Sequence, residues 1–255
     1  PGSRVGLRID PAAGVGYNAH LEYSGAAPSK FGIALERLDD ALAAAARHDL
    51  TIDTVHVHAG SGWLRDGLGA FEAALGPLVE AVTMVHAAGH EVTEVNVGGG
   101  LGVPARADEE PVDLDAYAAA LHRHLGSLGV TVAAEPGDYL AKDTAILLSE
   151  VVSLETRRGV TFVGLDMGWN VNCSYFIYRY AQEFVLCRSA DAARTERVTV
   201  AGHINEAGDI FAEDYAMPSV AEGDIVALLN AGGYHQAMSS THCLRPMAGS
   251  LMLDR

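Results

Sequence analysis

Apolar residues follow two alternating spacings along the first half of the chain. Short runs that are apolar at nearly every position are each followed by a longer stretch in which apolar residues recur every three to four positions. The first spacing predicts buried β-strands and the second predicts amphipathic helices, because side chains repeat with different periods in the two structures. The predicted strands are residues 4–9, 52–59, 91–99 and 130–136, and the predicted helices are residues 34–49, 67–89 and 112–129.

This strand–helix alternation predicts a parallel sheet with right-handed crossovers. The pattern contains four strands joined by three helices, and thus at most four strand–helix units, whereas a closed β/α barrel is built from eight. We therefore expect either an open sheet or a barrel of which half lies outside this sequence.

The pattern changes after about residue 145. Residues 145–168 alternate as antiparallel strands do, and apolar segments at 183–189, 197–202, 224–233 and 249–254 follow without long helical patterns. We expect a strand–helix domain, either an open sheet or a partial β/α barrel, at residues 1–145 and an antiparallel β domain at residues 146–255.

Composition narrows the class of protein. The 255 residues carry a formal net charge of −16 and no basic patch, which argues against nucleic-acid binding. Three cysteines without CxxC spacing do not form a disulfide framework, which favours a reducing, cytoplasmic setting. No apolar run approaches the roughly 18 residues of a membrane span, and no signal segment is recognisable, so no membrane association is expected.

Polar residues gather where the predicted strands end. His58, the glycines 98–100 and Glu135 each follow a strand, and in β/α barrels that end carries the active site. In "VNVGGGLG" the glycine amides could cradle a phosphate, or the glycines could simply form a tight turn with positive φ. Glu135 in "AAEPGDYL" could hold a positive charge, such as a protonated pyridine nitrogen, or cap the next turn.

Two histidines in "VHVHAGSG" share one strand face, and three interpretations stay open. His56 and His58 could bind zinc, although Glu135 is the only other obvious strand-end ligand. One imidazole could instead lie against an aromatic cofactor whose phosphate is bound by Ser61 and Gly62. The pair could also be buried and hydrogen-bonded. Similarly, His203, Asn205, Glu206 and Asp209 in "GHINEAGDI" suit a metal site, proton transfer or a turn.

Nine segments in order carry a family resemblance. They are "LRID", "SKFGI", "HVHAGSG", "VNVGGGLG", "AEPGDYL", "FVGLDMGWN", "GHINEAGDIFAED", "EGDIVALLNAGGYHQAMSS" and "RPMAG". Together they resemble the fold-type III decarboxylases that depend on pyridoxal 5′-phosphate (PLP), the family of diaminopimelate, ornithine and arginine decarboxylases. The resemblance implies the C-terminal part of a (β/α)8 barrel followed by an antiparallel β domain, in a head-to-tail homodimer with shared active sites.

The resemblance also implies roles for individual residues. His58 would stack on the PLP ring, Glu135 would pair with the pyridine nitrogen, and Arg8 would lie near the ring substituents. The remaining cofactor contacts, chiefly to the phosphate, would come from Ser61, Gly98, Gly99, Gly100, Gly137 and Tyr234. Asp166, Ser174 and Glu206 would line the substrate site, with Asn205 and Glu206 in the catalytic loop and Asp209 anchoring its turn. The implied reaction is decarboxylation of an amino acid, with no metal.

The chain departs from the family pattern in four respects. The Schiff-base lysine of the first barrel strand has no counterpart, because Lys30 and Lys142 match other positions. We therefore expect a C-terminal portion whose missing half-barrel comes from the same gene or from another chain. Asp138 replaces an arginine, and Asn205 replaces a cysteine that helps to return a proton. Ser174 replaces the arginine that binds a distal carboxylate, so diaminopimelate is not the expected substrate.

Three functions follow from these observations. The first is a PLP-dependent amino-acid decarboxylase acting on a small-molecule substrate. The second is a non-catalytic homologue that binds a partner protein, which the absent lysine, Asp138 and Asn205 favour. The third is a metal-dependent barrel hydrolase that uses His56 and His58.

Overall fold

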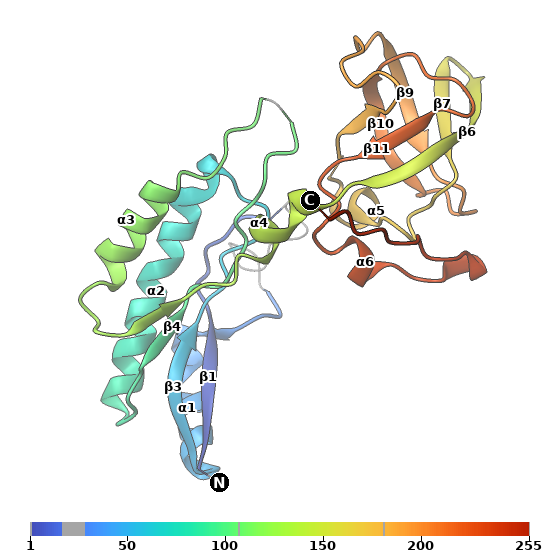
Figure 1. Cartoon of the computed structure of the whole chain (residues 1–255). Helices are drawn as coiled ribbons and strands as arrows, with labels where there is room; N and C mark the ends of the chain where they lie inside the picture. Colours follow the sequence, from blue (N-terminus) through green and yellow to red (C-terminus); the bar gives the residue numbers. More distant parts are fainter. Residues whose placement is uncertain (1, 17–28, 107, 181, 255) are drawn as a thin grey trace. The chain divides into compact units, whose positions relative to one another are not determined.

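The computed structural model describes residues 2–16, 29–106, 108–180 and 182–254, and the chain divides into two compact units. Unit 1 is Pro1–Tyr139 and unit 2 is Leu140–Arg255. The division falls in the short helix α4 (Gly137–Ala141), whereas the sequence places the domain boundary at residues 145–146. Figure 1 shows the course of the chain.

Unit 1 is an open sheet of five parallel strands, in the order β2-β1-β3-β4-β5. The predicted strand–helix alternation is confirmed, and β2 is an additional strand of two residues that is too short to produce a periodic signal. The elements are β1 (Ser3–Asp10), β2 (Ile33–Ala34), α1 (Leu38–Arg47), β3 (Leu50–His56), α2 (Leu68–Ala87), β4 (Glu94–Asn96), α3 (Leu114–Leu125) and β5 (Thr131–Ala133), with 3-10 turns at Leu35–Arg37 and Arg65–Gly67.

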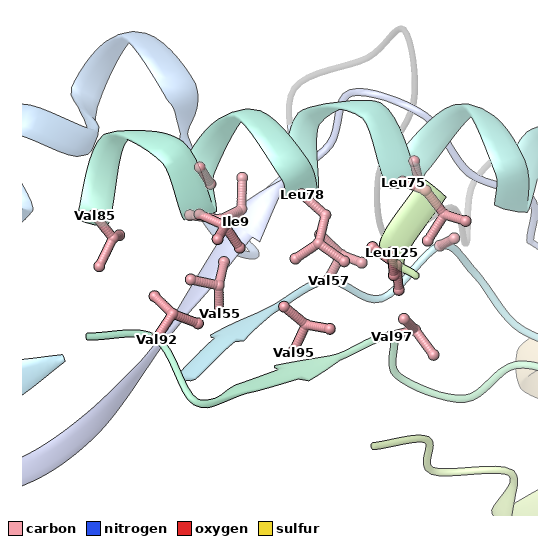
Figure 2. Packing of buried hydrophobic residues seen from close by; sticks show 14 of the residues in the cluster. Ile9, Val55, Val57, Leu75, Leu78, Val85, Val92, Val95, Val97 and Leu125 are labelled. Carbon is pink, nitrogen blue, oxygen red and sulfur yellow. The ribbon is translucent and has the colours of Figure 1, made fainter. Parts of the chain in front are cut away.

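The core of unit 1 lies between α2 and the sheet. Figure 2 shows Leu75 and Leu78 of α2 beside Val55 and Val95 of the two central strands, all of them fully buried. Burying one such side chain stabilises the fold by about 1.5–3 kcal/mol. This packing explains the apolar composition of Arg65–Ala87, which is long and apolar enough to cross a membrane, contrary to the expectation from the sequence.

β3 ends at His56 and β4 at Asn96, earlier than the predicted ends at residues 59 and 99. Glycine-containing loops follow both strands. Val57 N–H still donates to the carbonyl of Asn96 at 3.0 Å, and Val97 N–H donates to the carbonyl of Ala133 at 3.0 Å. Beyond them, Gly98 and Gly100 have φ values of 69° and 93°, which lie in the left-handed region that favours glycine. The strand ends therefore pass into tight loops on one edge of the sheet.

Unit 2 is a six-stranded sheet in the order β10-β9-β7-β6-β11-β8, with a single parallel pair, β7 and β9. The predicted β character of this half is confirmed. β10 was not predicted, and residues 249–254, which were expected to continue the β pattern, have no regular structure. The elements are β6 (Leu147–Arg157), β7 (Val160–Leu165), α5 (Ser174–Tyr178), β8 (Phe184–Leu186), β9 (Glu196–Ala201), β10 (Ile210–Met217), β11 (Ile225–Leu228) and α6 (His235–Met238), with 3-10 turns at Lys142–Thr144 and His242–Leu244.

Candidate active site

One face of the unit 1 sheet carries a row of polar residues in register. Arg8 of β1 is paired with His56 of β3, His56 with Asn96 of β4, and Asn96 with Ala133 of β5. Val55, Val57, Val95 and Val97 pack on the helix side, so strand alternation places Arg8, His56, His58, Asn96 and Glu135 on the opposite side. We call these five residues the polar face.

Glu135 is held by a short hydrogen-bond network on this face. Asn96 Nδ2 donates to Glu135 Oε1 at 2.8 Å, while Asn96 Oδ1 accepts the N–H of Gly98 at 2.8 Å. Glu135 N–H in turn donates to the Gly98 carbonyl at 2.8 Å. More than half of the Glu135 side chain remains exposed. The carboxylate is therefore oriented by Asn96 and still open to a ligand, as a partner for a cation requires.

The glycines 98–100 approach neighbouring backbone so closely that side chains would not fit. A Cβ on Gly99 would overlap the carbonyl oxygen of Glu135, and a Cβ on Gly100 would overlap that of Gly60. The positive φ values of Gly98 and Gly100 bear out the tight-turn interpretation. Neighbouring carbonyl oxygens fill the space beside these glycines, and the N–H groups of Gly98 and Gly99 donate to Asn96 and His58.

His58 is a neutral imidazole. Burial lowers its pKa to about 4, and the nearby charge of Arg8 and the neighbouring His56 act in the same direction. The N–H of Gly99 points at His58 Nδ1 at 3.4 Å, which makes Nδ1 the acceptor and places the proton on Nε2. A flat, uncharged ring of this kind is suited to lie against an aromatic cofactor.

His56 shares this environment. Burial is the main cause that lowers its pKa; Glu135, whose Oε1 lies 3.9 Å from His56 Nε2, opposes the shift. Among the residues that the structure describes, no three His, Cys, Asp or Glu side chains gather as metal ligands. His56 and His58 therefore find no third ligand there, and the metal-hydrolase hypothesis gains no support.

Three other expected cofactor residues also lie in unit 1. Ser61 donates its N–H to the carbonyl of Val15 at 2.9 Å, which fixes the loop after β3. Gly137 begins α4 and donates its N–H to the carbonyl of Glu135 at 2.8 Å. The guanidinium of Arg8 lies 4.6 Å from the centre of the Phe31 ring.

Lys30 and Lys142 each lie over an aromatic ring, and Asp138 is buried. Lys30 lies over the ring of Phe31 at 5.0 Å, and Lys142 is buried over the ring of Tyr180 at 4.6 Å. Asp138 is buried in the first turn of α4.

The loop 203–209 of unit 2 is built around the carboxylate of Asp209. This carboxylate is buried, and it accepts the N–H of Trp169 at 2.7 Å and the N–H of Ile204 at 2.6 Å. Burial raises the pKa of Asp209, and the two backbone donors act against that rise. Asp209 is therefore the anchor of the turn, and it presents Asn205 and Glu206 at the loop surface, where both are exposed.

The segment His242–Cys243 lies on this loop. The Cys243 thiol donates to Asn205 Oδ1 at 3.2 Å, and His242 Nε2 lies 3.7 Å from Glu206 Oε1. The His242 ring packs on Trp169 with a centroid distance of 4.6 Å. No motif in the sequence signals these contacts, because they join residues that are 36 to 73 positions apart.

Two expected substrate residues, Asp166 and Ser174, and one expected cofactor residue, Tyr234, lie elsewhere in unit 2. Asp166 Oδ1 accepts from Ser149 Oγ at 2.5 Å and from the N–H of Glu150 at 2.9 Å, and it lines a cavity of about 470 Å³ together with His203. Ser174 begins α5, with its Oγ 3.4 Å from Nε2 of His235. Tyr234 precedes α6, has a φ of 64° and is exposed.

The comparisons with known proteins agree on one family. A family model described as "Pyridoxal-dependent decarboxylase, pyridoxal binding domain" matches residues 1–142. Diaminopimelate decarboxylases of Methanothermobacter thermautotrophicus and Escherichia coli are 31% and 32% identical to the chain; the matches cover 99% and 100% of it, and 60% and 63% of those proteins.

Solved structures show the same likeness. The diaminopimelate decarboxylase of Helicobacter pylori complexed with L-lysine has a TM-score of 0.83 at 25% identity, covering 96% of this chain and 60% of that one. A further diaminopimelate decarboxylase has a TM-score of 0.82 at 32% identity, covering 97% and 61%. The chain thus spans about 60% of the length of these relatives. The predicted fold, part of a β/α barrel followed by a β domain, is confirmed.

Proposed function

Because the chain belongs to the pyridoxal-dependent decarboxylase family, we propose that it serves in the decarboxylation of an amino acid with PLP as the cofactor. The polar face of unit 1 carries this proposal. It combines an oriented carboxylate with a neutral imidazole beside the glycines 98–100, and all of it lies inside the matched residues 1–142.

The residues of the polar face fit the cofactor group by group. Glu135 is the carboxylate for a protonated pyridine nitrogen, and Asn96 holds it in place. His58 offers a flat neutral ring for stacking, and we propose that Gly98, Gly99, Gly100 and Ser61 hold the phosphate. We propose that Gly137, Tyr234 and Arg8 complete the cofactor contacts. When bound, PLP supplies the electron sink that accepts the electrons released as carbon dioxide leaves.

Cys243, which contacts the loop 203–209 at Asn205, supplies the proton in this proposal. The amide of Asn205 has no acidic proton at ordinary pH, whereas a thiol does. Cys243 donates its thiol proton to Asn205 in the structure, so we assign the proton to Sγ of Cys243 and the orientation of that thiol to Asn205. After carbon dioxide departs, the α-carbon takes the proton from Sγ, and the thiolate recovers a proton from water.

Glu206 is the substrate-facing carboxylate of the same loop. Its Oε1 lies within 3.7 Å of His242, so its position is set by unit 2 itself. We propose that Glu206 and Asp166 face the substrate, and that two subunits share their active sites. Ser174 cannot supply the charge of an arginine, so we propose a substrate other than diaminopimelate, even though the relatives named above carry that activity in their names.

An absorbance experiment with the complete protein tests the proposal. We expect added PLP to give the visible band of a lysine-bound cofactor, which borohydride removes, and to support release of labelled carbon dioxide from an amino acid labelled in its carboxylate. A protein that neither binds PLP nor releases carbon dioxide contradicts the proposal. Binding of PLP without release from any amino acid would favour the non-catalytic homologue, whose specific support is Asn205 in place of an acid.

A further inference from the structure

Tyr234 is held in a backbone conformation that an aromatic residue rarely adopts. Its φ is 64° and its ψ is −27°. The N–H of His235 donates to the carbonyl oxygen of Gly233 at 2.9 Å, which closes a three-residue turn around Tyr234. A turn of this kind with positive φ at its central residue is rare and strained, and such strain persists only where surrounding contacts enforce it. Other groups must therefore hold this turn closed.

The side chain of His235 strengthens the same turn. Its Nδ1 lies 2.7 Å from the carbonyl oxygen of Gly233, and because a backbone carbonyl only accepts, Nδ1 is the donor. The other ring nitrogen, Nε2, lies 3.1 Å from Oε1 of Gln182. Both ring nitrogens of His235 are thus used to fix the turn, and the ring acts on its neighbours rather than on a ligand.

Gln182 joins the two ends of the segment that contains this turn. Its Nε2 donates to the carbonyl oxygens of Leu229 and Asn230 at 2.9 and 3.2 Å. Its Oε1 faces His235 and also accepts from Nδ2 of Asn172 at 2.6 Å. Gln182 and Asn172 are only 3% and 2% exposed, so water does not replace these hydrogen bonds when a partner is removed. One buried amide therefore fixes both the start and the end of residues 229–235.

We infer that Gln182 and His235, which we call the clamp, are positioning residues that hold Tyr234 ready for the cofactor phosphate. This inference rests on the proposed function, in which Tyr234 contacts the cofactor. The clamp acts only through the backbone of Tyr234. Without the clamp the turn relaxes to negative φ, and the phosphate can then bind the phenol only if the strained turn forms again. The clamp thereby tightens cofactor binding without adding a contact, which is the effect of preorganisation.

A double-mutant cycle tests this coupling through the Kd for PLP, measured by titration of the complete protein. His235→Phe keeps a ring but removes both ring hydrogen bonds. We expect it to raise the Kd roughly 10-fold, the effect of one strained residue that is no longer held in place. Tyr234→Phe removes only the phenol hydroxyl and should raise the Kd roughly 10- to 100-fold. The double variant should match Tyr234→Phe, because no hydroxyl is left to position. Effects that multiply would overturn the inference.

Two further variants make the result specific. Gln182→Met removes the other half of the clamp and should show the same coupling to Tyr234, which keeps the test decisive if His235→Phe does not fold. Gln236→Ala, at an exposed position next to His235 on α6, is the matched control and should leave the Kd unchanged. A general loosening of unit 2 would instead raise the Kd by the same factor with or without the phenol hydroxyl, and would overturn the inference.

Urea unfolding of the complete protein without PLP gives a second readout. Glycine adopts positive φ without strain, so Tyr234→Gly should raise the urea midpoint when the clamp is intact. In the His235→Phe background the turn is already relaxed, and the same replacement should not raise the midpoint. An equal shift in both backgrounds would overturn the inference. If the shifts differ as expected while the protein binds no PLP, the clamp on Tyr234 is supported and the decarboxylase proposal fails.

Discussion

The thiol of Cys243 donates a hydrogen bond to Oδ1 of Asn205 at 3.2 Å, although the two residues are 38 positions apart in the chain. Asn205 lies in a loop whose shape is set by Asp209, and Cys243 follows His242, which contacts the same loop at Glu206. The thiol of Cys243, which can release a proton, is thereby placed beside the amide of Asn205, which cannot.

Replacing Cys243 should slow the proposed reaction at its proton-transfer step. We expect Cys243→Ala to lower kcat about 10²- to 10⁴-fold, the usual contribution of a general acid, without weakening substrate binding. Steady-state rates together with substrate binding to the cofactor-loaded protein measure the two effects separately. Cys187→Ala, at another exposed cysteine, should leave both unchanged. Wild-type turnover in Cys243→Ala would rule out the thiol as the donor.

Removing the charge of Glu135 should weaken its proposed hold on the pyridine nitrogen. We expect Glu135→Gln to lower kcat by roughly 30-fold or more, as for loss of one member of a desolvated charge pair. The amide retains the size of the carboxylate and can still accept from Asn96. Glu80→Gln, at an exposed position on α2, is the control, and turnover is the measurement. A variant with full activity would argue that Glu135 only caps the turn.

An alanine at Gly99 should destabilise unit 1. The added Cβ would overlap the carbonyl oxygen of Glu135, so the loops after β4 and β5 would have to separate. We expect Gly99→Ala to lower the free energy of unfolding by about 1–3 kcal/mol. Gly69→Ala is the opposite case, because it lies in the first turn of α2 with open space around it, and alanine there should stabilise the helix by up to about 1 kcal/mol. Urea unfolding compares the two, and equal effects would contradict the predicted overlap.

The depressed pKa of His58 predicts how stability depends on pH. The pKa is about 4 in the folded chain, against about 6.5 for an unperturbed histidine. Between these values the unfolded chain binds more protons, so stability falls as the pH drops from 6.5 towards 4 and is fully retained above that window. After allowance for solvent screening, the effect is on the order of 1–2 kcal/mol.

Urea unfolding at pH 5 and pH 7 measures this effect for the chain and for His58→Gln. In His58→Gln, the free energy of unfolding should differ less between pH 5 and pH 7 than it does in the unchanged chain. His86→Gln, at an exposed position on α2, should keep the full difference. Identical pH dependence in all three proteins would show that His58 is not buried as described.

Asp209 should matter for stability more than its neighbours in the loop. In Asp209→Asn the amide nitrogen would meet a backbone N–H of Trp169 or Ile204, so one buried donor would lose its acceptor. We expect the free energy of unfolding to fall by about 1–3 kcal/mol. Asp191→Asn, at an exposed position, should change it little. Thermal unfolding of both variants checks the difference, and an unchanged Asp209→Asn would contradict the anchor role.

The sequence predicted the strands and helices whose apolar residues repeat with a regular local period. The strands and helices of unit 1 repeat with clear periods, and His58, Gly98–Gly100 and Glu135 follow strands that the structure places side by side. β2, with two residues, and β10, whose buried positions do not alternate, carry no such signal. The contacts of His235 with Gln182 and of Cys243 with Asn205 cross 53 and 38 residues, and only the folded chain brings them together.

The seven residues of β3 supply side chains both to the core of unit 1 and to the polar face, and the register of the strand decides which side chain faces which side. Val55 packs under α2 while its neighbour His56 points the other way, so shifting the strand by one position would exchange their environments. A single inserted or deleted codon within Leu50–His56 would therefore bury an imidazole and expose a valine at once. A change of length in this strand therefore disturbs the core and the polar face together, whereas a substitution changes only one side chain.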